Sequence, residues 1–179
     1  KEIEHLYNIC WSNDGRWIVS TVHGGMGYSH AILAIEVNGN RVIDLKIPGC
    51  RPDLSPDGKR VVWGSDDTTF RIGDIDLDSD TPSIANIITA ITDELHIYHS
   101  DWSPDGRYIS FSRGPGGKTQ ANGPGTHRGI AELVGVRAQW DICVFPVSGD
   151  GGAIQLTSDG MSNKESDWLI QPAKGGTAR

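Results

Sequence analysis

A four-residue turn recurs three times along the chain and limits what the sequence can fold into. Residues 103–106 and 55–58 both read Ser-Pro-Asp-Gly, and residues 12–15 read Ser-Asn-Asp-Gly. Proline presets φ at the second turn position, aspartate bonds to its own backbone, and glycine accepts the positive φ that closes the turn. Because the starting serines are 43 and 48 residues apart, the sequence predicts one structural unit repeated at a nearly constant interval.

The segments that follow each turn have the alternation of half-buried strands. After the third turn, Ile109 and Phe111 fall on one face and Ser110 on the other. Two more apolar segments complete each unit. The predicted third strands are 30–35, 73–77 and 140–145, and the predicted fourth strands are 41–45, 84–88 and 153–157. Each unit is therefore expected to be a sheet of four short antiparallel strands.

Four-strand units that recur about every 40 to 50 residues, without helical periodicity between them, are typical of β-propeller blades. We expect one partial propeller domain over 1–179, with blade 1 at about 7–49 and blade 2 at about 50–98. Blade 3 is expected at about 99–165 with a loop insertion at 114–138, because its repeat is some twenty residues longer. Residues 166–179 begin a further blade or form a tail, since Asp167-Trp168 starts the pattern again before it stops.

These residues resemble the TolB-like propeller repeat, whose hallmark is an Asp-Trp-Ser-Pro-Asp-Gly turn followed by an apolar strand. Residues 101–106 match the hallmark in full and residues 55–58 match its turn, whereas Asn13 replaces the proline in the first copy. The resemblance covers nearly the whole chain. It implies an all-β, TolB-like β-propeller with an incomplete ring of three to four four-stranded antiparallel blades.

Three blades and a remnant cannot close a ring of six or more, so sheet faces and edges are left uncovered. We expect the chain to be a fragment of a larger protein, because it begins inside a repeat and residues 174–179 read as a flexible tail. The alternative is a dimer in which two copies complete one ring.

Composition narrows the range of partners. The formal net charge of -7 disfavours nucleic acid, whose binding depends on lysine and arginine displacing counterions. No apolar run reaches the roughly 18 residues of a membrane helix, and the first residues lack the build of a secretory signal.

The three cysteines, Cys10, Cys50 and Cys143, lack metal-ligand spacing and are expected to be buried on strands. One disulfide is possible if two of them meet in space.

The insertion in the third repeat is the strongest candidate for partner binding, because loops of this length in compact domains are usually binding elements or disordered. It contains a Gly-Gly-Lys-Thr stretch, but Ser112 stands where a phosphate-binding loop needs its first glycine, and Pro124 opposes the helix that should follow. The predicted partner-binding residues are Lys118, Thr119, Asn122, His127 and Arg128.

No cofactor, metal site or catalytic residue is predicted. The alternating carboxylates at positions 74, 76, 78 and 80 lack the glycine and terminal carboxylate of a calcium loop and are expected to form a solvated face. His96 and His99 are expected to be structural hydrogen-bonding residues. No serine or cysteine stands in a recognisable nucleophile motif, and the turn aspartates occur once per repeat, as turn formation requires.

The sequence therefore predicts a non-catalytic propeller segment that binds a protein or peptide partner or other subunits of a complex. The resemblance implies the periplasm or cell envelope. The rival is an accessory propeller that gates or docks substrate for a larger enzyme, either a prolyl-oligopeptidase-type peptidase or a periplasmic redox enzyme. A third and weaker hypothesis is sugar or lactone chemistry at a metal in the central channel.

Overall fold

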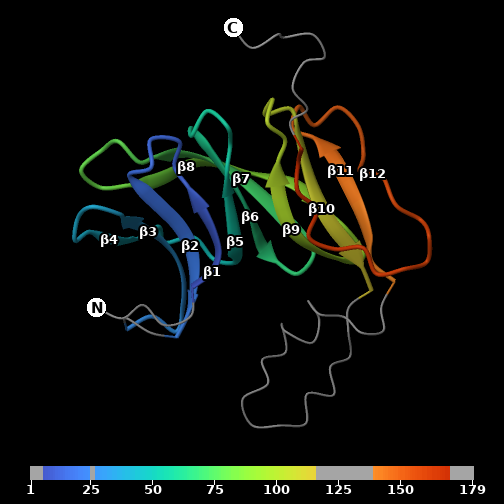
Figure 1. Ribbon diagram of the computed structural model, residues 1–179, viewed down its shortest axis with the longest axis horizontal. Helices are drawn as coiled ribbons and strands as arrows, with labels where there is room; N and C mark the ends of the chain where they lie inside the picture. The colour runs from blue at the N-terminus through green and yellow to red at the C-terminus, as the bar shows by residue number, and fades with distance from the viewer. Residues whose placement is uncertain (1–5, 25–26, 116–138, 170–179) are drawn as a thin grey trace, which may run out of the picture.

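The computed structural model describes residues 6–24, 27–115 and 139–169, and within these residues it contains strands and turns but no helix (Figure 1). The strands form three four-stranded antiparallel sheets, each joined in chain order. The first sheet contains β1 (Leu6–Trp11), β2 (Trp17–His23), β3 (His30–Glu36) and β4 (Val42–Asp44). The second contains β5 (Cys50–Leu54), β6 (Arg60–Asp66), β7 (Thr69–Asp76) and β8 (Ser83–Thr92). The third contains β9 (His96–Trp102), β10 (Tyr108–Gly114), β11 (Asp141–Pro146) and β12 (Ile154–Gln155). The all-β prediction is confirmed.

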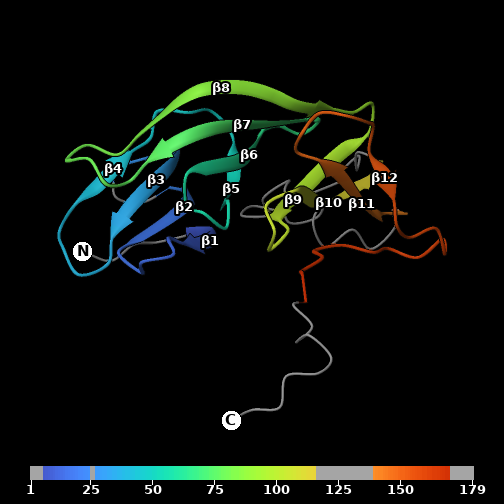
Figure 2. The same cartoon turned by 90° about the horizontal axis from the view of Figure 1, so that it is seen from above.

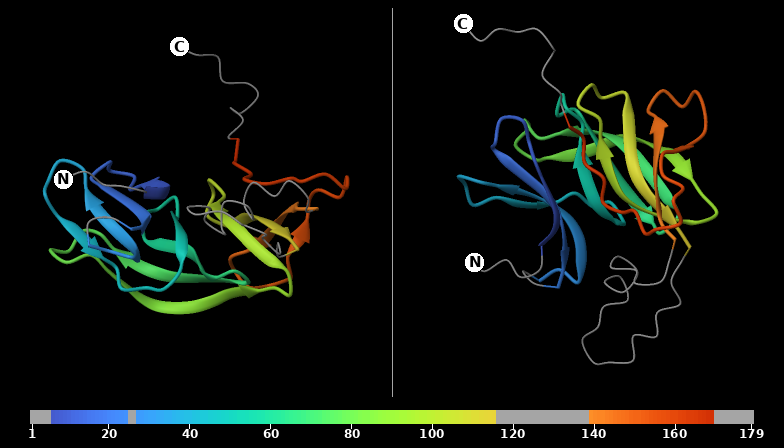
Figure 3. Two further views of the ribbon diagram at one scale, coloured as in Figure 1. Left: turned by 90° about the horizontal axis from the view of Figure 1, so that it is seen from below. Right: turned by 45° about the vertical axis from the view of Figure 1, so that its right-hand side comes forward.

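The three sheets follow one another around an open arc, as Figures 2 and 3 show. The first strands of successive sheets are neighbours, because β1 contacts β5 and β5 contacts β9. These inner strands face the concave side of the arc, and the later strands of each sheet lie toward its convex side. The arrangement is that of propeller blades in an unclosed ring.

A repeated hydrogen-bond pattern explains the Ser-x-Asp-Gly turns. In each turn the serine hydroxyl donates to the aspartate at 2.6 Å, and the same aspartate accepts the backbone N–H two residues further on. These bonds favour the charged carboxylate and lower the pKa of all three aspartates, that of Asp105 to about 2. The turn glycines Gly15, Gly58 and Gly106 have φ of 69°, 70° and 68°, where an L side chain is strained.

The departure at Asn13 has a local cause. Its side-chain amide donates to the backbone carbonyl of Pro56 in the turn of the next sheet. A proline at position 13 could not make this bond. The first turn therefore lacks the rigid proline of the other two turns, and its asparagine instead links it to the turn of the next sheet.

The core lies between the sheets. Eleven buried residues, among them Trp17 and Trp63, fill the space between the first and second sheets. Nine more, including Phe70, Phe111 and Phe145, fill the space between the second and third. The ring of Phe111 meets those of Phe70 and Phe145 edge-on at 5.7 and 5.8 Å. Each sheet is thus stabilised by the apolar face of its neighbour.

The two flanks of the arc differ. On the first sheet Val22, Ala31 and Leu33 are buried beneath half-buried apolar residues, and the Trp11 side chain is 54% exposed. On the third sheet the segment 163–168 lies against β10, where Glu165 N donates to Ser112 Oγ at 2.9 Å and the hydroxyls of Ser166 and Ser110 are 3.0 Å apart. Within the described residues, the first flank therefore exposes Trp11, and the second is partly covered by the segment 163–168.

The structure also tests the expectations for the cysteines and for the four alternating carboxylates. The cysteines lie on β1, β5 and β11 as free thiols, and only Cys143 is fully buried. The four alternating carboxylates are all exposed, which confirms the solvated interpretation. Strand β7 ends at Asp76, however, so Asp78 and Asp80 belong to the following turn and not to a strand face.

We predict that Phe111→Ala lowers the free energy of unfolding by about 3–5 kcal/mol, because it leaves a cavity between two sheets. The matched control is Ile88→Ala on β8, where the side chain is 59% exposed and the expected change is within about 0.5 kcal/mol. Urea unfolding followed by tryptophan fluorescence measures both. Equal losses in the two variants would contradict the placement of the core.

Candidate functional site

Each inner strand carries the same irregularity. The register of all three inner pairings shifts at a bulge, and one non-glycine residue there adopts a left-handed conformation. The segment after β12 repeats that conformation. The four residues and their φ angles are Asn8 at 50°, Arg51 at 55°, His99 at 54° and Glu165 at 57°. Bulges redirect side chains, so Asn8, Arg51 and His99 turn in the same sense at equivalent places of successive repeats. Glu165 has the same conformation outside a strand, and we call the four together the bulge residues.

The bulge residues interact with one another across the arc. The Asn8 amide lies 3.2 and 3.4 Å from the two ring nitrogens of His99. His99 Nε2 lies 3.4 Å from Glu165 Oε1. Burial lowers the pKa of His99 and the Arg51 charge lowers it further, while Glu165 acts in the opposite direction. Residues from the first sheet, the third sheet and the following segment therefore share one polar cluster.

In the second and third sheets, the aspartate two positions after the bulge residue is bonded to the tryptophan of the next repeat. Trp102 Nε1 donates to the backbone carbonyl of Asp53 at 3.2 Å, and Trp168 Nε1 donates to that of Asp101 at 3.1 Å. Trp102 N also donates to Asp53 Oδ2 at 2.8 Å. The Asp-Trp pair of the sequence hallmark is thus a clamp between successive repeats, in which the aspartate accepts and the tryptophan of the next repeat donates.

A hollow of about 260 Å³ lies where these inner segments meet. We call it the axial hollow. Its lining includes Asn8, Arg51, His99, Asp53, Asp101 and Asp167. Four successive repeats thus contribute to one concave surface, which no single repeat could form.

Two carboxyl groups in the axial hollow are poorly solvated. Burial raises the pKa of Asp53 to about 6. Burial, followed by the charges of Asp53 and Asp167, raises that of Asp101 to about 7. The side chains of Asp53 and Asp101 interact, so the two carboxyl groups titrate as a pair. Asp101 Oδ2 is buried and has no hydrogen-bond partner among the described residues.

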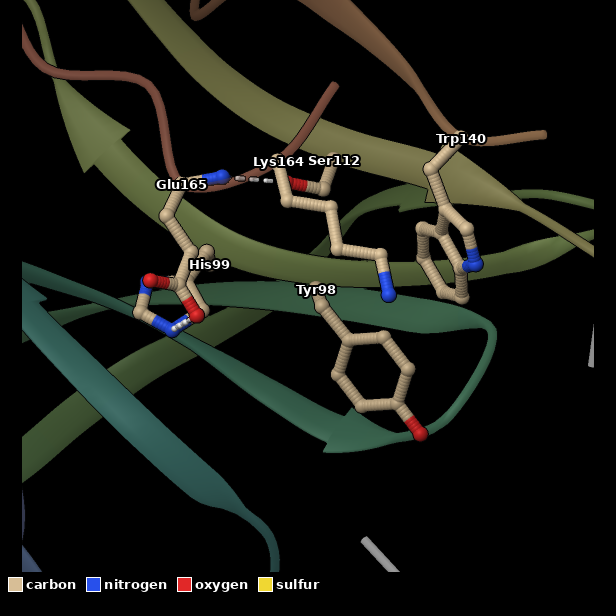
Figure 4. A pocket seen from close by; sticks show the side chains of 6 residues that line it. All are labelled: Tyr98, His99, Ser112, Trp140, Lys164 and Glu165. Atoms are coloured by element: carbon tan, nitrogen blue, oxygen red, sulfur yellow. Dashed lines mark hydrogen bonds and ion pairs between the residues drawn. The ribbon is translucent and has the colours of Figure 1, made fainter. Parts of the chain in front are cut away.

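A second site, beside the axial hollow, is filled by its own side chains (Figure 4). The Arg51 guanidinium lies 4.4 Å from the Tyr98 ring, the Tyr98 and Trp140 rings are 5.4 Å apart, and Lys164 Nζ lies 4.3 Å from the Trp140 ring. This alternation of cations and rings leaves no space for a water molecule. It is a packing contact that joins the third sheet to the segment 163–168.

The structure tests only some of the predicted site residues. Lys118, Thr119, Asn122, His127 and Arg128 lie outside the described residues. The hydrogen-bonding role expected of His99 is confirmed, while His96 packs against the Tyr98 ring. No group of three or more potential metal ligands is found in the described part of the chain. Sequence reasoning missed Asn8, Arg51 and Glu165, although they stand two positions before Cys10, Asp53 and Asp167, as His99 does before Asp101.

Comparison with known proteins identifies solved structures that have a similar fold. No protein-family model and no curated protein matches the sequence. Among solved structures, a putative TolB from Agrobacterium tumefaciens matches with a TM-score of 0.58 and 15% identity over 87% of this chain. TolB from Acinetobacter baumannii matches with 0.52 and 14% over 88%, and Kuenenia stuttgartiensis hydrazine synthase with 0.50 and 21% over 87%.

The chain spans 50%, 33% and 43% of the lengths of those three proteins, respectively. The described sheets are therefore blades of a β-propeller. The propeller is TolB-like, which confirms the fold expected from the turn motif, and the ring is incomplete. None of the described segments is a helix long and apolar enough to cross a membrane.

We predict that Asp101→Asn stabilises the protein at pH 8 and flattens its pH dependence. The raised pKa values mean that the folded state holds protons which the unfolded state has released above about pH 4. Stability contributed by this pair therefore falls as pH rises from about 4 to about 7. The variant should melt about 2–4 °C higher at pH 8. Thermal unfolding from pH 4 to pH 8 measures this, and a parallel pH profile in the two proteins would refute it.

Proposed function

We propose that this chain is a non-catalytic propeller segment that binds a protein or peptide partner through its axial face, in the cell envelope. The observation that carries the proposal is the axial hollow, to which four successive repeats contribute polar side chains. Concave sites with a few convergent polar groups are the usual places of ligand binding. The envelope location rests on the TolB-like resemblance alone.

The repetition of the lining groups favours binding over catalysis. Asp53 and Asp101 stand at equivalent positions, and the backbone carbonyl of each accepts the indole N–H of the next repeat. Their backbone carbonyls therefore belong to the frame of the propeller, while their side chains line the hollow. The bulge residues, in contrast, differ chemically from repeat to repeat, as recognition of an asymmetric partner requires.

A second candidate is an accessory propeller that gates or docks substrate for a larger enzyme. The likeness to hydrazine synthase supports it, because a propeller of this kind then also occurs within an enzyme. In that case the axial face contacts another part of the same protein or its substrate.

Photo-crosslinking separates the two candidates. Ile9 lines the axial hollow and its side chain is 53% exposed, so p-benzoylphenylalanine can replace it at little cost to folding. We predict that the label at position 9, in the full-length protein in its native host, yields an intermolecular adduct of defined mass. The same label at Ile88 on the convex side is the control.

An intramolecular crosslink from position 9 would favour the accessory propeller. Equal adducts from positions 9 and 88, or none from position 9, would overturn the assignment of the axial face as the binding surface.

A further inference from the structure

Two adjacent residues of β9 leave polar atoms buried without partners in the axial hollow. The Ser100 side chain is 7% exposed, and neither its Oγ nor Asp101 Oδ2 forms a hydrogen bond within the described part of the chain. Both residues line the hollow. Buried polar atoms in native proteins are nearly always hydrogen-bonded, because an unmade bond leaves the loss of hydration uncompensated. Two acceptors without partners in the wall of the hollow are groups that a ligand with hydrogen-bond donors would satisfy.

The charge around these atoms specifies the ligand further. Three carboxylates line the hollow, those of Asp53, Asp101 and Asp167. The cations nearby are engaged elsewhere, because Arg51 lies over the Tyr98 ring and His99 contacts Asn8 and Glu165. No lysine or arginine of the described residues forms an ion pair with any of the three carboxylates. The Arg51 side chain that lines the hollow thus leaves these three carboxyl groups without an ion-pair partner among the described residues.

The shape of the site distinguishes between cations. A metal ion needs several ligands within about 2.0–2.6 Å of one point, and no such group is found over the described ranges. A hollow of about 260 Å³ instead accommodates a side chain. A guanidinium offers five donors in a planar fork and suits carboxylates spread around a cavity better than the compact ammonium group of lysine does.

We propose that the axial hollow binds an arginine side chain of the partner, with its guanidinium between Asp101, Asp53 and Ser100. The proposal rests on the proposed function, since it names the group of the partner that enters the axial face. Ile9 and Pro52 also line the hollow and supply apolar surface for the methylene stem of the arginine. The partner segment is therefore a peptide that presents at least one exposed arginine.

Titration with short peptides tests the proposal. The full chain, labelled with ¹⁵N, is titrated with acetyl-Gly-Arg-Gly-amide and, in parallel, with the citrulline analogue, which has the same shape but no charge. We expect saturable amide shifts at Ser100 and Asp101 with the arginine peptide and about tenfold weaker binding of the citrulline peptide. Equal affinities, or shifts confined to other residues, would overturn the proposal.

Matched variants locate the binding. Asp101→Asn and Ser100→Ala should each weaken binding of the arginine peptide, the first by about tenfold and the second by severalfold. Asp150→Asn removes one carboxyl group from an exposed position after β11 and should leave the affinity unchanged. If Asp150→Asn weakens binding as much as Asp101→Asn does, the attraction is a property of the net charge and the proposed site is wrong.

The two proposals fail separately. A specific adduct from position 9 together with no preference for arginine over citrulline would overturn the arginine site and leave the axial face as the binding surface. The opposite result is a failed crosslink from position 9 together with preferential arginine binding that Asp101→Asn abolishes. It would overturn the axial face as the partner-binding surface and leave the arginine site.

Discussion

Contact between neighbouring sheets is the constraint on which this structure depends. A four-stranded sheet has two faces, and here one face of each buries large aromatic residues such as Trp17, Trp63 and Phe111 against the next sheet. Burial of this kind is the main favourable term in folding. Because the sheets are held in series, their first strands come together on one side, and every feature of the axial hollow follows from that convergence.

The clamp between successive repeats sets the fine geometry. An indole donates to a backbone carbonyl two repeats in a row, at 3.2 and 3.1 Å, and this places Asp53 and Asp101 side by side. The same contacts that hold successive repeats together also bring the carboxyl groups of Asp53 and Asp101 into a poorly solvated space. The unusual electrostatics of the axial hollow are therefore a consequence of how the repeats are joined.

Much of the fold could be predicted from the sequence because its signals are local. A Ser-Pro-Asp-Gly turn and the alternation around Ile109 each specify a few neighbouring residues, and the structure confirms the strands they predict. The axial hollow could not be predicted in this way. The left-handed conformation at Asn8, Arg51 and His99 occurs at irregularities of strand pairing and not at glycine. The contact of Asp53 with Asp101 joins residues of different repeats. In the sequence, the bulge residues can be found only by aligning the repeats, because each stands two positions before Cys10 or one of the aligned aspartates.

The four bulge positions bear on how such a protein can diversify. An amide, a guanidinium, an imidazole and a carboxylate occupy the same backbone conformation, with φ from 50° to 57°. The conformation is therefore imposed by the frame and is indifferent to the side chain it carries. Exchange of these residues can alter what the inner surface recognises without disturbing the blades, so selectivity and architecture are free to evolve independently.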